Sequence, residues 1–162
     1  MIIAAFVYSG IYIIYSKREQ VRALRELCNA LRHLYAELNA RLSPLPEITA
    51  RLTKNTGKYA PVFFSEVNTE LIQLGEISFH EIWENAADKT LDCIGAQEKD
   101  ELKRLGNILG AYELEEQLNA VTLCCKALEK KLDCAEKELA EQERTCIGIY
   151  SVLGVLVAVV LI

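Results

Sequence analysis

The strongest signal in the sequence is a heptad pattern in its last third. From residue 111 onward, apolar side chains recur at alternating spacings of four and three, with Glu, Lys, Gln and Asn between them. This is the spacing of a seam along which two helices wind around each other. No Pro follows Pro61 and no Gly lies between Gly110 and Gly148, so the pattern predicts one uninterrupted helix that runs to the C-terminus. The seam positions are Leu114, Leu118, Val121, Cys125, Leu128, Leu132, Ala135 and Leu139.

The N-terminal part of the chain has the same design. Residues 1–16 carry no charged side chain, Lys17 and Arg18 end this apolar run, and a second heptad seam follows. The simplest packing joins the two long helices antiparallel with their seams buried against each other, which places Leu31 and Leu128 in the interior. The seam positions of this helix are Val21, Leu24, Cys28, Leu31, Tyr35, Leu38 and Leu42.

The middle of the chain predicts four short helices. Pro44 and Pro46 separate the first long helix from a second helix that begins near residue 46, because Pro disfavours helix at the preceding residue but suits a first turn. A third helix begins near Pro61 and ends at Gly75. A capping box at 78–81 opens a fourth helix, and a fifth occupies about 97–109 and ends at Gly110. The residues expected to be buried are Ile48, Leu52, Phe63 or Phe64, Val67, Leu71, Leu74, Ile82, Trp83, Ala86, Leu91, Leu102, Leu105, Ile108 and Leu109.

Both ends of the chain predict membrane segments. Each apolar run is about 15 to 17 residues long, slightly short of the usual spanning length, but an exposed apolar tail is costly unless lipid or a partner covers it. Basic residues follow the first run and precede the second, so the positive-inside rule places the region between them in the cytoplasm and both termini outside. We therefore expect transmembrane segments at 1–16 and 147–162 and a helical bundle at 17–146. The predicted fold class is all-α: an antiparallel six-helix bundle whose two long helices extend into membrane segments.

The net charge and the spacing of the cysteines limit the kinds of binding and catalytic site that we expect. The net charge is −5, and no concentrated basic stripe of the kind that binds nucleic acid occurs. The six cysteines lack the paired spacing of a zinc site, and neither His33 nor His80 has a partner at a catalytic spacing. We expect reduced, mostly buried thiols, no metal or cofactor, and no catalytic site. Trp83 is expected to anchor the core of its helix.

Several stretches, taken together in their order and spacing, carry a family resemblance. They are Pro44-Leu45-Pro46-Glu47, Trp83, Leu105-Gly106 followed by Leu109-Gly110, the residues Glu113, Glu115 and Gln117, and Tyr150-Ser151 with Leu153-Gly154. With these stretches the chain resembles, over essentially its whole length, the stage III sporulation protein AB family of endospore-forming bacteria. One departure is Tyr112-Glu113, where the family usually shows Ser-Asp.

The resemblance implies a non-enzymatic platform subunit of the sporulation channel complex, in the mother-cell membrane facing the forespore. The family is similar to the cytoplasmic domains of type II secretion and type IV pilus inner-membrane platform proteins, which are six-helix bundles beside a cytoplasmic secretion ATPase. The implied partners are other channel-complex proteins including such an ATPase, the membrane, and a possible second copy of the chain.

Four residues are candidate partner contacts on this reading: Gly106, Gly110, Glu113 and Gln117. For Gly106 and Gly110, the alternative to partner contact is a structural role in helix termination and close packing. A rival function is a membrane-anchored coiled-coil scaffold that self-associates without an ATPase, and a third is a membrane enzyme or thiol redox sensor that uses the cysteines.

Overall fold

The computed structural model describes the backbone of residues 2–41, 44–109, 111 and 113–161, and the side chains of residues 12–40, 44–109, 111, 113–145 and 148. Within these residues the chain forms six α-helices, one short 3-10 turn and no strand. The elements in order are α1 (Ile2–Arg41), α2 (Leu45–Leu52), α3 (Ala60–Glu70), the 3-10 turn η1 (Leu71–Gln73), α4 (Phe79–Thr90), α5 (Ala96–Ile108) and α6 (Leu114–Leu161).

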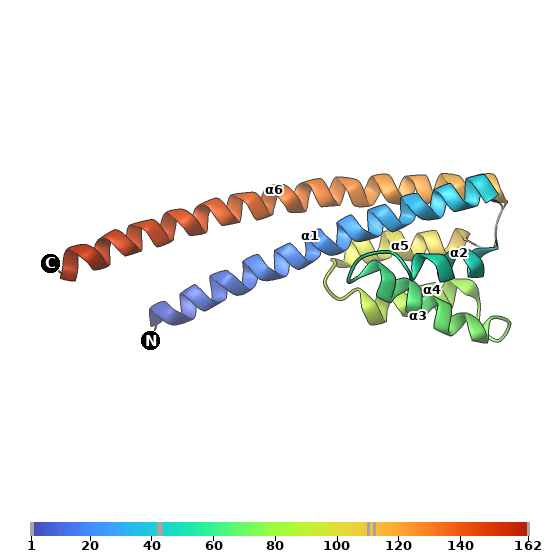
Figure 1. Cartoon of the computed structure of the whole chain (residues 1–162), viewed down its shortest axis with the longest axis horizontal. Coiled ribbons are helices and arrows are strands. Elements are labelled where there is room, and N and C mark those ends of the chain that lie inside the picture. Colours follow the sequence, from blue (N-terminus) through green and yellow to red (C-terminus); the bar gives the residue numbers. More distant parts are fainter. Residues whose placement is uncertain (1, 42–43, 110, 112, 162) are drawn as a thin grey trace.

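The two long helices, α1 and α6, run side by side in opposite directions, and both chain termini lie at the same end of the molecule (Figure 1). The four short helices pack against the half of this pair that lies away from the termini. The predicted all-helical fold with six helices is therefore confirmed, as is the antiparallel packing of the two long helices.

The predicted seams are buried where α1 meets α6, with one exception. Leu31 and Leu128 are each at most 1% exposed, and every other described seam position except Tyr35 is buried or half-buried. Leu42 lies outside the described residues. The exception is Tyr35, which is 38% exposed, while the neighbouring Leu34 is fully buried. The prediction for Tyr35 was wrong because α1 is covered on two sides. Its buried arc is wider than a heptad seam, and it turns toward the short helices at this point.

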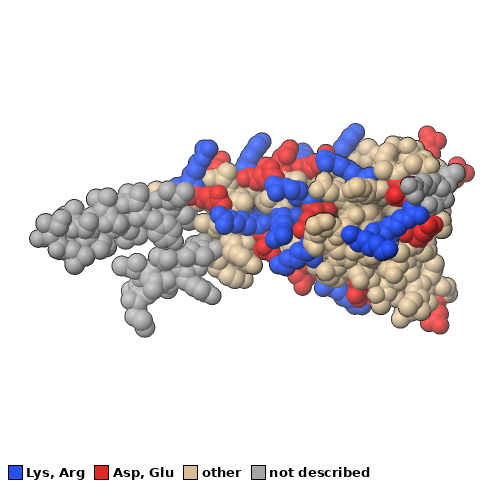
Figure 2. All heavy atoms as spheres, in the orientation of Figure 1, with Lys and Arg blue, Asp and Glu red and all other residues tan. Residues whose placement is uncertain are grey.

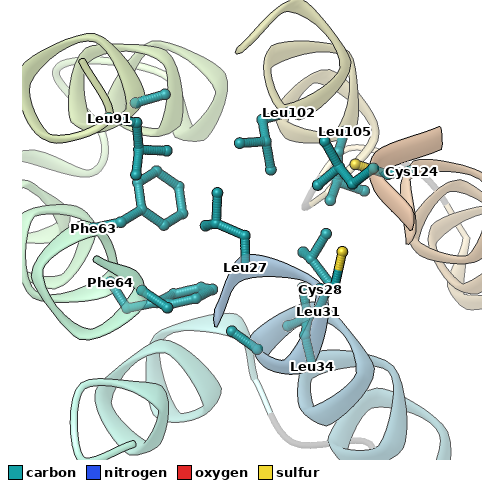
Figure 3. Packing of buried hydrophobic residues seen from close by; sticks show 14 of the residues in the cluster. Leu27, Cys28, Leu31, Leu34, Phe63, Phe64, Leu91, Leu102, Leu105 and Cys124 are labelled. Carbon is teal, nitrogen blue, oxygen red and sulfur yellow. The ribbon is translucent and has the colours of Figure 1, made fainter. Parts of the chain in front are cut away.

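The second buried side of α1 faces the short helices. Figure 3 shows Leu27 pointing away from the α1–α6 seam and toward Phe63 and Leu102, which come from α3 and α5. Three further α1 residues on this side, Ala23, Ala30 and Leu34, are also buried. The heptad pattern alone did not reveal this second side, because these residues lie between the seam positions.

A ladder of three ion pairs fixes the register of α1 against α6. Arg18 pairs with Glu143 at 2.8 Å, Arg25 with Glu136 at 2.7 Å, and Arg32 with Glu129 at 2.6 Å. Successive pairs are seven residues apart on both helices and run in opposite directions, as an antiparallel heptad pair requires. The Arg side chains are largely exposed, so each pair adds little stability in water. Their common spacing instead selects one alignment, since a slip by one turn would separate all three pairs.

The short helices begin as predicted, but α3 ends early. Ser78 and Glu81 form the expected reciprocal capping box at the start of α4. The predicted burial of Leu74 is wrong, because α3 stops at Glu70 and passes into the tighter η1 turn, which rotates the following side chains outward. Gly75, with φ +113°, lies in the loop after this turn and does not cap α3 directly.

An aromatic cluster joins α3, α4 and α5. The Trp83 ring is edge-on to Phe63, with ring centres 4.9 Å apart, and also to Phe64 at 5.9 Å. Its indole Nε1 donates a hydrogen bond of 2.8 Å to the carbonyl oxygen of Leu102 in α5. This satisfies the one polar atom of a fully buried Trp, so the ring contributes its large apolar area without an unpaired donor. The expected role of Trp83 as a core anchor fits this geometry.

Carboxylates of α1 hold the start of α3. The Oε2 atom of Glu26 accepts hydrogen bonds from the backbone N–H groups of Lys58 (2.8 Å), Tyr59 (2.7 Å) and Ala60 (3.3 Å). These N–H groups lack partners within α3, and a negative charge at a helix N-terminus is favourable. A Cβ at Gly57 would lie 2.5 Å from Glu26 Oε2, so the close approach requires glycine. No local pattern in the sequence indicated this contact between distant segments.

Among the side chains that the structure describes, no helical stretch combines the length and hydropathy of a membrane span. The predicted membrane segments at 1–16 and 147–162 lie largely outside those side chains.

The pairing of α1 with α6 predicts that emptying either seam destabilises a single chain. Leu31→Ala and Leu128→Ala should each lower the free energy of unfolding by about 2–5 kcal/mol, because each leaves a cavity between the two helices. Leu123→Ala is the matched control, since Leu123 also lies on α6 but is 67% exposed, and it should cost less than about 0.5 kcal/mol. Denaturant unfolding followed by circular dichroism measures the difference. A midpoint that rises with protein concentration would contradict pairing within one chain.

Candidate functional site

The candidate partner-contact residues belong to the end of α5 and the start of α6, which lie at the end of the molecule opposite both termini (Figure 1). Glu113 is exposed immediately before α6, and its carbonyl oxygen accepts a hydrogen bond of 3.1 Å from the N–H of Gln117. Gln117 is half-buried in the first turns of α6. Gly110 lies outside the described residues. Glu113 therefore offers a charged side chain to a partner, and its contact with one stays a prediction.

Gly106 is buried in α5 directly beneath the indole of Trp83. A Cβ at this position would lie 2.5 Å from Trp83 Cδ1 and 2.8 Å from Cγ, closer than real side chains approach. The absence of a side chain lets α5 approach α4 closely enough for the Trp83 indole to reach the Leu102 carbonyl. This geometry favours close packing, the alternative that the sequence left open for Gly106.

Pro44 and Pro46 start α2. Pro44 precedes the helix with extended backbone angles, φ −63° and ψ 144°, and its carbonyl oxygen accepts from the N–H groups of Glu47 (2.9 Å) and Ile48 (3.3 Å). Pro46 lies in the first turn, where its missing N–H would have no partner in any case. The Thr49 hydroxyl donates to the Pro46 carbonyl oxygen at 2.9 Å. Both prolines thus have a local structural role in setting where α2 begins.

Three thiols gather where α1, α5 and α6 meet. Cys28 and Cys125 occupy seam positions, and Cys124 is buried on the α5 side of α6, where its Sγ is 3.7 Å from the Glu101 carbonyl oxygen (Figure 3). Desolvation raises the pKa of Cys28 and Cys124 to about 12 and that of Cys125 to about 11. A thiol that stays protonated is a poor nucleophile and a poor metal ligand. These thiols act as small apolar side chains in the core.

The described side chains offer no arrangement suited to a metal or to catalysis. No group of three or more His, Cys, Asp or Glu among them could hold a metal ion. The grooves lined by described side chains include one of about 240 Å³ between α5 and α6 and one of about 310 Å³ between α1 and the loop after α2. The first is lined by acidic and basic side chains in similar number, and the second mainly by small polar residues. Neither concentrates the perturbed, convergent groups typical of a reactive site.

The contact between Gly106 and Trp83 can be tested by adding a methyl group. Gly106→Ala should lower the free energy of unfolding by about 1–3 kcal/mol, because the indole must move and lose its hydrogen bond. Trp83 is the only Trp, so its fluorescence spectrum should also shift. The matched control is Gly148→Ala in α6, where an added Cβ meets nothing within 4 Å. An unchanged spectrum and unchanged stability for Gly106→Ala would contradict the packing role.

The thiol environments predict selective alkylation of the folded protein. At pH 8, iodoacetamide should modify the exposed Cys134 and leave Cys28, Cys124 and Cys125 unmodified, because burial both blocks these thiols and raises their pKa well above the ambient pH. Mass spectrometry of the intact and digested protein measures this. Denatured protein, in which all thiols react, is the control. Rapid modification of Cys124 in the folded protein would contradict the structural role.

Comparisons with known proteins agree with one another. The family model for stage III sporulation protein AB (spore_III_AB) matches residues 1–162. Stage III sporulation protein AB of Bacillus subtilis (strain 168) is 25% identical and covers 99% of this chain and 94% of its own length. A solved structure of stage III sporulation protein AB (SpoIIIAB) aligns with a TM-score of 0.68 and 27% identity, over 75% of this chain and 97% of its own. The resemblance found in the sequence is therefore confirmed, and the chain belongs to the stage III sporulation protein AB family.

Proposed function

We propose that this protein is a non-enzymatic membrane platform subunit of the sporulation channel between mother cell and forespore, and that it couples a cytoplasmic ATPase to the envelope assembly. Membership of the stage III sporulation protein AB family supports a role in sporulation within a multi-protein complex. In the coupling role, the chain transmits movement from one partner to another and catalyses no reaction.

One observation carries this proposal: both apolar ends leave the bundle at the same end of the α1–α6 pair (Figure 1). If the runs at 1–16 and 147–162 enter one membrane, the region 17–146 forms a single body on one side of it. Lys17, Arg18 and Arg144 border the two runs, which supports a cytoplasmic position for that body. Tyr12 and Tyr15, both exposed, suit the membrane–water interface just inside this border. The membrane would be that of the mother cell facing the forespore.

The α1–α6 pair is also suited to transmit movement from the short helices to the two apolar ends. Its seam is close-packed, and the Arg–Glu ladder resists sliding of one helix along the other. A partner that pushes or rotates the short helices would thus displace the pair as a unit, and the two membrane segments with it.

The rival scaffold function needs seams that are free to join another chain. Here Leu24 and Leu31 of α1, and Val121 and Leu128 of α6, are buried within one chain. Self-association would have to use other surfaces, so the intramolecular filling of the seams favours the platform role over the coiled-coil scaffold.

Two measurements on the full-length chain in sporulating cells test the proposal. An export-dependent reporter fused after Ile162 should be active, and the same reporter inserted in the exposed loop at Lys54 should be inactive. The secretion-type ATPase of the sporulation complex should co-purify with the tagged chain. A cytoplasmic reporter signal after Ile162 would refute the proposed topology. A topology as proposed without any ATPase association would instead favour the scaffold function.

A further inference from the structure

We propose that the outward face of α3 pairs with the same face of a second copy of this chain in the same membrane, with the two α3 helices parallel. The inference rests on the proposed function, from which it takes the membrane anchoring. It deepens that function by naming the surface through which two platform subunits associate. We call this surface the α3 face, and it comprises Val62, Ser65, Thr69 and Ile72.

The α3 face is a regular and exposed stripe. Its residues follow one another at spacings of three, four and three, so they lie on one side of the helix, opposite the buried Phe63, Phe64 and Val67. Ile72 lies in the tighter η1 turn that directly continues α3. All four side chains are exposed, Val62 to 52% and Ile72 to 86%. This spacing is that of a seam between two helices, and here no described helix covers it.

The absence of charge distinguishes α3 from the other helices. Among the exposed positions that the structure describes, those of α3 are Val, Ser, Asn and Thr, whereas each of the other five helices exposes at least one Lys, Arg, Asp or Glu. The two carboxylates of α3, Glu66 and Glu70, both pair with Lys89 of α4, at 3.1 Å for Glu66. Figure 2 shows charged side chains crowded on the half of the bundle nearer the termini, and mostly uncharged surface over the short helices.

The polar atoms of the α3 face are compatible with burial against an identical face. The Thr69 hydroxyl already donates a hydrogen bond of 2.8 Å to the carbonyl oxygen of Ser65, so covering it leaves no unpaired donor. The Ser65 hydroxyl can both donate and accept, which allows it to bond to the same hydroxyl of a second copy. Val62 and Ile72 provide apolar area at the two ends of the stripe.

The membrane determines how two copies meet. If both ends of each chain enter the same membrane, a symmetric pair has its two-fold axis along the membrane normal. α3 begins beside Glu26 of α1 and runs away from the termini (Figure 1), so this axis brings two α3 helices together in parallel. Each residue of the α3 face then faces its own copy. A charge there would meet an identical charge, whereas a different protein could offer the opposite one, so an uncharged face favours a second copy.

The size of the α3 face implies a weak contact. The helix has 11 residues, which gives it a length of about 16 Å. A single helix face of this length covers much less than the area of about 800 Å² per partner in a standard interface. Association therefore depends on confinement of both copies to one membrane, which raises their effective concentration. The contact joins complete bundles and leaves the α1–α6 seam intact.

A charge exchange at Thr69 tests the pairing. The full chain is reconstituted in liposomes of zwitterionic lipid as two populations, labelled with a donor dye and an acceptor dye, and energy transfer measures association. Thr69→Lys and Thr69→Glu should each weaken association at least about tenfold, because identical charges then face each other across the axis. An equal mixture of the two variants should restore the energy transfer, since opposite charges then meet.

Oxidative cross-linking tests whether like residues meet. Thr69→Cys in the same liposomes, with copper phenanthroline and dissolved oxygen as oxidant, should form a disulfide between the two introduced thiols. Mass spectrometry of the digested product distinguishes this link from one through the native, exposed Cys134. Asn107 is the matched control position, because it is exposed and uncharged but lies on α5, which packs against α4 and α6. Asn107→Cys should form no link, and Asn107→Lys should leave the energy transfer unchanged.

The outcomes separate this inference from the proposed function. Loss of energy transfer with each charge variant, its return in the mixture and a link through Thr69→Cys together support the α3 face. Transfer that Thr69→Lys leaves unchanged, or that the mixture does not regain, overturns the parallel pairing of like residues. Absence of transfer in the wild type also overturns it, while the reporter and ATPase measurements still decide the proposed function. A cytoplasmic reporter signal after Ile162 would overturn both.

Discussion

The structure depends on the antiparallel packing of α1 against α6. Neither helix buries its apolar stripe alone, and the four short helices have no other continuous surface on which to assemble. Dispersion and apolar burial along the seam provide the stability, while the heptad-spaced ladder of Arg18, Arg25 and Arg32 with glutamates of α6 selects the register. The same alignment also brings both termini, and with them the two apolar runs, to one end of the molecule.

A second constraint ties the short helices to this pair. α1 is buried on two sides, so its Leu27 and Leu34 belong to the core formed with α3 and α5 as much as to the long-helix pair. The indole of Trp83 packs over Gly106 in that core, and the carboxylate of Glu26 caps the start of α3. The short helices and α1 therefore share one core. This mechanical continuity is the physical basis of the proposed platform role, in which a partner at one end displaces membrane segments at the other.

The distribution of charge differs between the two ends of the molecule. Basic residues border the apolar runs, whereas the stretches 59–88 and 105–125 contain no Lys or Arg. The end of α1 and the helix α2 also lie at the end away from the termini, and these carry Arg41 and Arg51. Glu115 and Glu116 lie in the first turn of α6, where negative charge is favourable at a helix N-terminus.

The sequence by itself determined the elements of this fold, because helix signals are local. The seams, the prolines before α2 and the capping box of Ser78 and Glu81 placed six helices and their antiparallel arrangement, and short motifs indicated the family. Only the tertiary structure decided which side chains of these helices are buried and which of them contact one another. Tyr35 and Leu74 are exposed because two-sided burial of α1 and the η1 turn rotate them outward. The Gly106–Trp83 contact and the Glu26 cap join segments far apart in the chain, and such contacts follow from packing that no local pattern encodes.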